Sequence, residues 1–171
     1  MEENASTARV ALKFGVLGAV VIMVYTTILN VTGLSFNKGL GFVSYLFLIP
    51  AIILALNDFR QQNKGFIAYG EGLGLGSLLS AVLGLLVSMF GMFYTRFIDP
   101  TILTQAVDKA RRDMEASGMD DAQIETNIEI AGKFMTPGFV FLGTVFMFLL
   151  IGFIFSLIIS AIMRKEKPIF E

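Results

Sequence analysis

The sequence predicts an all-α integral membrane protein: a four-helix bundle with a two-helix amphipathic insertion between spans three and four. Three observations lead to this fold class. Hydrophobic residues make up 55% of the 171 positions, charged residues only 16%, and the mean hydropathy is +0.74. Four apolar stretches are long enough to cross a hydrocarbon core of about 30 Å. A charged segment at 95–136 separates the last two stretches and repeats apolar residues at helical spacing.

Composition also excludes several function classes. The net charge is -1, and no basic run is interleaved with aromatic residues, so we expect no nucleic-acid partner. The chain has no cysteine and no histidine, which excludes disulfides, thiolate nucleophiles and the usual zinc and copper sites. We therefore expect no cofactor, no metal and no catalytic residue, and we expect the lipid bilayer to be the main environment of the chain.

The first span is expected at about 10–32. Ala11, Gly15 and Ala19 recur at every fourth position, a spacing that lets a neighbouring transmembrane helix approach closely. A cleavable signal peptide is the competing interpretation. The length of the apolar run, the acidic residues before it and the lack of a small-x-small cleavage pattern favour a retained helix.

The second span is expected at 40–56, after a tight hairpin loop at 32–39 that contains two glycines. Pro50 lies inside this span and removes one backbone hydrogen bond, so we expect a bend there. The polar residues at 57–65 predict a second loop.

The third span, at about 70–94, is rich in small residues. Such residues weaken a helix in water by up to roughly 1 kcal/mol each, but in hydrocarbon the backbone must stay helical and small residues favour close helix packing. This row could be used inside one chain or could form a dimer. The predicted helix-packing residues are Gly72, Gly76, Ser80, Gly84 and Ser88.

Glu71 is the one candidate polar site. A carboxylate at the edge of a span can bind a proton or a cation. It also falls in the first turn of the third helix, where the helix dipole favours negative charge, and this structural explanation is the stronger of the two.

The segment 95–136 predicts two short amphipathic helices. Asp99 and Pro100 form a typical helix start, Gly118 suits a left-handed helix end, and Asp120 can cap the helix that follows. The hairpin could be a solvated structure packed on its own bundle, or it could be a docking surface for a partner or for lipid headgroups. Its expected apolar faces are Leu103, Val107, Ala110 and Met114, then Ile124, Ile128, Ala131 and Met135.

The fourth span is expected at 137–163, and it carries its own row of small residues at Gly152, Ser156 and Ser160. Basic residues follow it at Arg164, Lys165 and Lys167. A basic end of this kind marks the cytoplasmic side of a span. With four spans, both termini are then cytoplasmic and 95–136 is extracytoplasmic.

Several motifs resemble a known family. They are Phe-Ile-Asp-Pro at 97–100, Gly-Met-Asp-Asp at 118–121, Lys-Phe-Met-Thr-Pro at 133–137 and Ile-Ile-Ser-Ala-Ile at 158–162. Together they resemble the bacterial membrane family called domain of unknown function 4199. The resemblance implies a small four-span protein of the bacterial cytoplasmic (inner) membrane, and it supplies no activity, cofactor or site residue.

Two function hypotheses follow. The first is a structural, oligomerising or accessory subunit that docks a partner through its helical insertion, as a homo-oligomer or with another membrane protein. The second is a transporter or channel for a small solute or ion, with hydroxyl groups lining a polar route between the spans. The hydroxyls concerned are Tyr25, Thr26, Thr27, Ser44, Tyr45, Ser77, Ser80, Ser88, Thr144, Ser156 and Ser160.

Overall fold

The computed structural model describes residues 6–166, and Lys167 with the rest of the C-terminal end lies outside this range. The described chain divides into two compact units, one made of the residues up to Val87 together with those from Val145 onward, and one made of Ser88–Thr144. Two long helices, α4 (Tyr69–Phe93) and α7 (Pro137–Met163), each contribute residues to both units.

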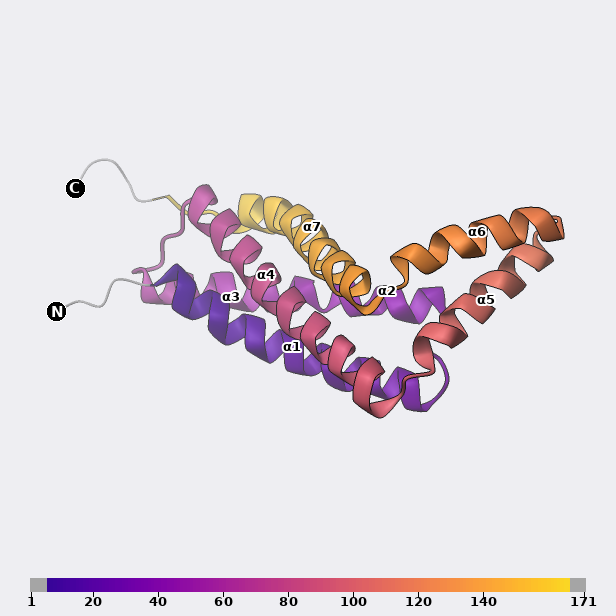
Figure 1. Cartoon of the computed structure of the whole chain (residues 1–171). Coiled ribbons are helices and arrows are strands. Elements are labelled where there is room, and N and C mark those ends of the chain that lie inside the picture. The colour runs from indigo at the N-terminus through magenta and orange to yellow at the C-terminus, as the bar shows by residue number, and fades with distance from the viewer. Residues whose placement is uncertain (1–5, 167–171) are drawn as a thin grey trace. The chain divides into compact units, whose positions relative to one another are not determined.

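The first unit is a bundle of antiparallel helices (Figure 1). It contains α1 (Thr7–Val31), α2 (Lys38–Leu46), α3 (Leu48–Gln62), the first part of α4 and the last part of α7. An ion pair between Lys13 and Asp58 joins the start of α1 to the end of α3. An isolated β-bridge between Ile67 and Lys165 joins the chain just before α4 to the chain just after α7. These contacts show that α1 is antiparallel to α3 and that α4 is antiparallel to α7, whereas α2 continues into α3.

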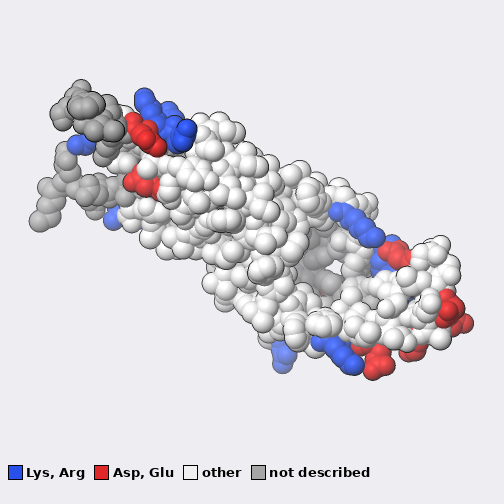
Figure 2. Space-filling model, turned by 90° about the horizontal axis from the view of Figure 1, so that it is seen from above, with Lys and Arg blue, Asp and Glu red and all other residues white. Residues whose placement is uncertain are grey.

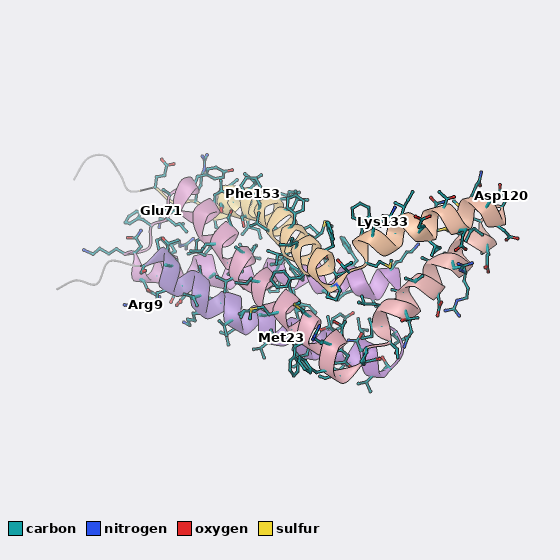
Figure 3. The ribbon with its side chains drawn as sticks, in the orientation of Figure 1. Arg9, Met23, Glu71, Asp120, Lys133 and Phe153 are labelled. Carbon is teal, nitrogen blue, oxygen red and sulfur yellow. The ribbon has the colours of Figure 1, made fainter. Side chains whose placement is uncertain are left out.

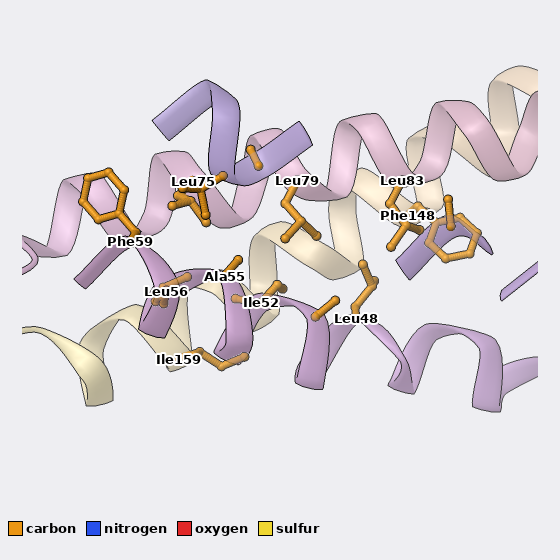
Figure 4. Close-up of a cluster of buried hydrophobic side chains, with 14 of the residues drawn as sticks. Leu48, Ile52, Ala55, Leu56, Phe59, Leu75, Leu79, Leu83, Phe148 and Ile159 are labelled. Atoms are coloured by element: carbon orange, nitrogen blue, oxygen red, sulfur yellow. The ribbon is translucent and has the colours of Figure 1, made fainter. Parts of the chain in front are cut away.

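The core of this unit is apolar and closely packed (Figure 4). Leu48, Ile52 and Leu56 line one side of α3 at helical spacing, and each is fully buried. Leu75, Leu79 and Leu83 form the corresponding stripe on α4. Large side chains thus fill the centre of the bundle, and small residues lie where helices approach each other most closely.

The second unit holds the helical hairpin, which we define as α5 (Ile102–Ala116) and α6 (Asp121–Phe134). The chain reaches it through a five-residue π-helical turn, Tyr94–Ile98, at the end of α4. The hairpin turn is closed by Gly118, whose φ is 79°. The amide of Gly118 donates to the carbonyl of Glu115 and that of Met119 to Met114, which is a Schellman end.

The all-α class and the four membrane-length apolar helices are confirmed: Thr7–Val31, Lys38–Gln62, Tyr69–Ile98 and Pro137–Met163 are long and apolar enough to cross a membrane. The location of the hairpin outside the bilayer stays a prediction.

Helix extends beyond the expected second span of 40–56 at both ends, from Lys38 to Gln62 with one break at Phe47. The Asn37 side chain accepts hydrogen bonds from two backbone amides and starts α2. The residues expected to form a loop at 57–62 are helical, since Phe59 is buried in the core. The helix is interrupted at Phe47, one turn before Pro50, which has no amide to donate to the preceding turn; the bend expected at Pro50 stays a prediction.

The expected start of α5 at Asp99 and Pro100 is also wrong. The Asp99 carboxylate accepts a hydrogen bond from the Thr101 amide at 3.0 Å and from its hydroxyl at 2.6 Å. These bonds form a turn ahead of the helix, and α5 begins at Ile102. Asp120 does cap α6, because its carboxylate accepts from the amide of Gln123 at 2.8 Å.

Candidate functional site

The five small residues of the α4 row are all buried. Within the first unit, each of the first four faces one residue of α7: Gly72 faces Ser160, Gly76 faces Ser156, Gly152 faces Ser80, and Gly84 faces Phe148. Every step of four residues forward along α4 is matched by a step of four backward along α7. We call this set of contacts the glycine–serine seam.

The seam brings the two helices into close contact. A methyl group added at Gly72 would lie 2.8 Å from the Ser160 hydroxyl oxygen, and one added at Gly84 would lie 2.8 Å from Cβ of Phe148. A methyl added at Gly76 would overlap the Ser156 side chain. Real Cβ atoms essentially never approach so closely. A side chain at any of these three glycines would therefore meet α7, so this part of the α4 row faces α7 of the same chain.

The serines of the seam alternate with the glycines across the interface. The Ser80 hydroxyl donates to the carbonyl of Gly76 at 2.8 Å, and the Ser156 hydroxyl donates to the carbonyl of Gly152 at 2.6 Å. The buried hydroxyl of Ser160 has no hydrogen-bond partner. The row ends at Ser88, which belongs to the second unit and whose buried hydroxyl also has no partner.

A second set of small residues lies between α1 and the rest of the bundle. Gly15 packs against α4, where an added methyl would lie 2.9 Å from a Val82 methyl carbon. Gly18 faces Leu83 and Ala51. Small residues therefore occupy contact positions on α1, α3, α4 and α7.

The outward faces of the same helices carry large apolar side chains. Phe146, Phe153 and Ile162 on α7 are exposed, as are Leu12 and Val24 on α1. Figure 3 shows Phe153 on the outside of α7, and the face of the bundle seen in Figure 2 is free of charge along the helices. A water-soluble protein would show the opposite distribution, with polar residues outside. Small residues inside and large apolar residues outside indicate a multi-pass membrane protein.

Glu71, the candidate polar site, lies in the first turn of α4 and is exposed. Its carboxylate accepts a hydrogen bond from the Ala68 amide at 2.8 Å. This bond satisfies a backbone donor at the start of the helix, as the reciprocal half of a capping box does. A shallow surface hollow beside it is lined by Asn63, Phe66, Ala68, Lys165 and Glu166. Figure 3 places Glu71 at the same end of the bundle as Arg9.

The hydroxyls of the spans bond mainly to their own helices. Those of Thr26, Thr27 and Ser77 each donate to a carbonyl three or four residues earlier. Tyr25 donates instead to the carbonyl of Leu40 at 2.9 Å, from α1 to α2. These bonds use the hydroxyl protons that a polar route would need. Within residues 6–166, no three acidic side chains come together to form a metal-binding group.

The hairpin combines charge with exposed apolar side chains. Arg111 of α5 and Glu125 of α6 form an ion pair at 3.0 Å across it. Ile124 is 2% exposed and forms its small core, whereas Ile130 is 49% exposed and Phe134 57% exposed. The segment 95–136 holds eight acidic and five basic residues, so it is acidic overall.

Comparison with known proteins gives one match. The family model described as "Protein of unknown function (DUF4199)" matches residues 13–165, which is nearly the whole chain. The chain belongs to the DUF4199 family. The match covers both units, so the DUF4199 domain includes the seam and the hairpin. No curated protein and no solved structure matches the chain.

Sequence reasoning missed two features of this DUF4199 domain. It noted the small-residue rows of the third and fourth spans separately, and their common spacing of four was the signal that could have paired them. It also missed an outward-facing apolar groove between α1 and α3, because neither helix shows it alone.

Proposed function

We propose that this DUF4199 protein is a structural or accessory subunit of the bacterial cytoplasmic membrane that docks a protein partner through its helical hairpin. The proposal places both termini in the cytoplasm and residues 95–136 outside the membrane. The basic residues that flank α7 at its C-terminal end, Arg164 and Lys165, support this orientation.

The observation that carries the proposal is the construction of the hairpin. Its turn is fixed by a Schellman end at Gly118 and by the Asp120 cap, and its two helices are joined by the Arg111–Glu125 ion pair. Despite this order, most of its surface stays exposed, and a shallow hollow is lined by the turn residues Met119 and Asp120 and by α6 as far as Asn127. A fixed shape with an unburied mixed surface suits recognition of another protein.

The charge of the hairpin indicates the kind of partner. Asp120 and Asp121 lie at its tip, and Glu115 lies in the last turn of the preceding helix. Figure 2 shows acidic residues gathered at this tip. We expect a partner with a basic surface, because complementary charge speeds association and favours the correct partner.

The seam supports a static role for the bundle. Its glycines and serines interlock in one register, and moving α4 past α7 by one turn would bring serine against serine at Ser80 and Ser156. This packing therefore weighs against a transport cycle in which α4 slides past α7. The position of Glu71 as a capping group weighs in the same direction.

Site-specific photo-cross-linking in intact cells tests the proposal. A photoreactive residue at Thr126, which lines the hollow on α6, should yield a discrete cross-linked protein. The same residue at Val20, on the apolar face of α1, is the matched control and should yield none. Raising the ionic strength should weaken the Thr126 cross-link. Absence of any adduct from Thr126, or equal adducts from both positions, would overturn the proposal.

A further inference from the structure

The outer face of the first unit carries a groove between α1 and α3. Its volume is about 200 Å³, and all of its lining is apolar. The two helices contribute matching stripes at positions i, i+3, i+4 and i+7. The lining residues are Phe14, Leu17, Gly18 and Val21 from α1, Phe47 from the break before α3, and Pro50, Ala51 and Leu54 from α3.

The groove exists because its floor has almost no side chains. Gly18 and Ala51 are both buried and face each other, so the floor lies close to the two backbones. Its rim is formed by Leu17, Val21 and Leu54, which are 55%, 48% and 54% exposed. The groove is therefore open to the surroundings of the bundle, and at this position along the spans those surroundings are hydrocarbon.

One end of the groove carries a charge. The Lys13 ammonium lies 4.9 Å from the centroid of the Phe14 ring, which lines the groove. The same ammonium bonds to the Asp58 carboxylate at 3.1 Å, one helical turn beyond Leu54. The side chain of Lys13 is 55% exposed, so it also faces outward. An ammonium has three donors, and the bond to Asp58 uses only one.

We propose that this groove is a binding site for one anionic phospholipid. An acyl chain lies along the groove from Phe14 toward Val21, and the lipid phosphate contacts the Lys13 ammonium. Seven residues of helix span about 10 Å. A dry cavity of about 150 Å³ holds a benzene molecule, so the groove accommodates several methylene groups of one chain. The charge at one end and the apolar floor along the rest match the two parts of a lipid.

This site is independent of the hairpin. Every residue involved belongs to the first unit, whereas the proposed docking surface belongs to the second. Failure of lipid binding would therefore leave the proposed function standing, and loss of the protein partner would leave the lipid site standing.

Native mass spectrometry of the purified protein with equimolar phosphatidylglycerol and phosphatidylcholine tests the site. We expect the wild type to retain one phosphatidylglycerol in preference to phosphatidylcholine. Leu17→Trp narrows the groove at its rim and should lower this retention by about tenfold, as expected when a shape-matched apolar pocket is filled. Leu12→Trp is the matched control, since Leu12 is equally exposed at 55% and lies outside the groove; it should change nothing.

Two charge variants separate lipid binding from a structural ion pair. Lys13→Gln should lower the retention of phosphatidylglycerol by about tenfold and leave phosphatidylcholine unchanged, because a charge-assisted bond is lost. Asp58→Asn should raise the retention of phosphatidylglycerol, because this change removes the carboxylate that competes with the lipid phosphate for Lys13. If the ion pair were merely structural, both variants would change the retention of phosphatidylglycerol in the same direction. That result would overturn the proposal.

Two further outcomes would also overturn it. One is equal retention of the two lipids by the wild type. The other is a change of oligomer size in Leu17→Trp but not in Leu12→Trp, which would assign the groove to a second copy of this chain. Circular dichroism of each variant provides the check that its helices are intact.

Discussion

Replacing Gly76 by alanine tests the glycine–serine seam directly. The added methyl group would overlap the Ser156 hydroxyl and would lie 2.8 Å from Cβ of Ser156 and 3.4 Å from a methyl carbon of Ile52. Neither neighbour is the end of a long flexible chain, so the helices must separate. Overpacking of this kind costs about 1–3 kcal/mol.

Gly74→Ala is the matched control. Gly74 lies two residues away on the same helix, is exposed, and has no atom within 4 Å of an added methyl. Both variants share the gain in helix propensity, which is about 1 kcal/mol in water. Their difference in free energy of unfolding therefore isolates the packing cost. We expect Gly76→Ala to be less stable than Gly74→Ala by about 1–3 kcal/mol.

The assay is reversible unfolding in mixed micelles, with denaturing detergent added stepwise and helicity followed by circular dichroism. The double variant Gly76→Ala with Ser156→Gly exchanges the bulk across the interface and should recover most of the loss. Residues in contact show coupling energies of about 0.5–3 kcal/mol, so the recovery is measurable. Equal stability of Gly76→Ala and Gly74→Ala, or no recovery in the double variant, would refute the seam.

Three further predictions concern the polar parts of the chain. A cysteine at the exposed Ser117 should react with a membrane-impermeant reagent in intact cells; protection until the cells are opened would reverse the orientation. Asp120→Ala should destabilise the start of α6 by about 1 kcal/mol, seen as faster hydrogen exchange of the Gln123 amide, and unchanged exchange would show that the cap contributes nothing. Glu71→Gln should retain the fold with a small loss of stability, because the amide oxygen still accepts from Ala68, and solute flux through liposomes that depends on Glu71 would instead establish the transporter alternative.

The fold class could be predicted from the sequence because it depends on averages over long segments. The fourth span coincides with α7 at Pro137–Met163, where a proline begins the helix and basic residues follow its end. The helix that holds the second span is longer than predicted, because hydropathy falls at Asn57 although α3 continues to Gln62. Its last turn is amphipathic: Phe59 enters the core while Asp58 pairs with Lys13 at the edge of the bundle. An average over apolar residues cannot detect such a turn.

The partner of the small-residue row could not be predicted from one sequence. Rows on α1, α4 and α7 have the same spacing of four, so each could face any other or a second chain. Which two rows pack together depends on the fit of individual side chains across the interface. The Ser156 side chain packs against Gly76, and the Ser80 side chain packs against Gly152. The apolar groove was hidden for a similar reason. It depends on Gly18 and Ala51 meeting across two helices that are far apart in sequence.

The most direct measurement is disulfide cross-linking across the seam in native membranes. A chain without cysteine gives no background, and Cβ of Ser160 lies 3.1 Å from the position of a Cβ at Gly72. This is close to the Cβ separation of about 3.5–4.5 Å in disulfides. Gly72→Cys with Ser160→Cys should form an intramolecular disulfide in the monomer, whereas Gly72→Cys with Ser156→Cys should not. A disulfide-linked dimer, or equal cross-linking of the two pairs, would contradict a bundle closed by α4 and α7 of the same chain.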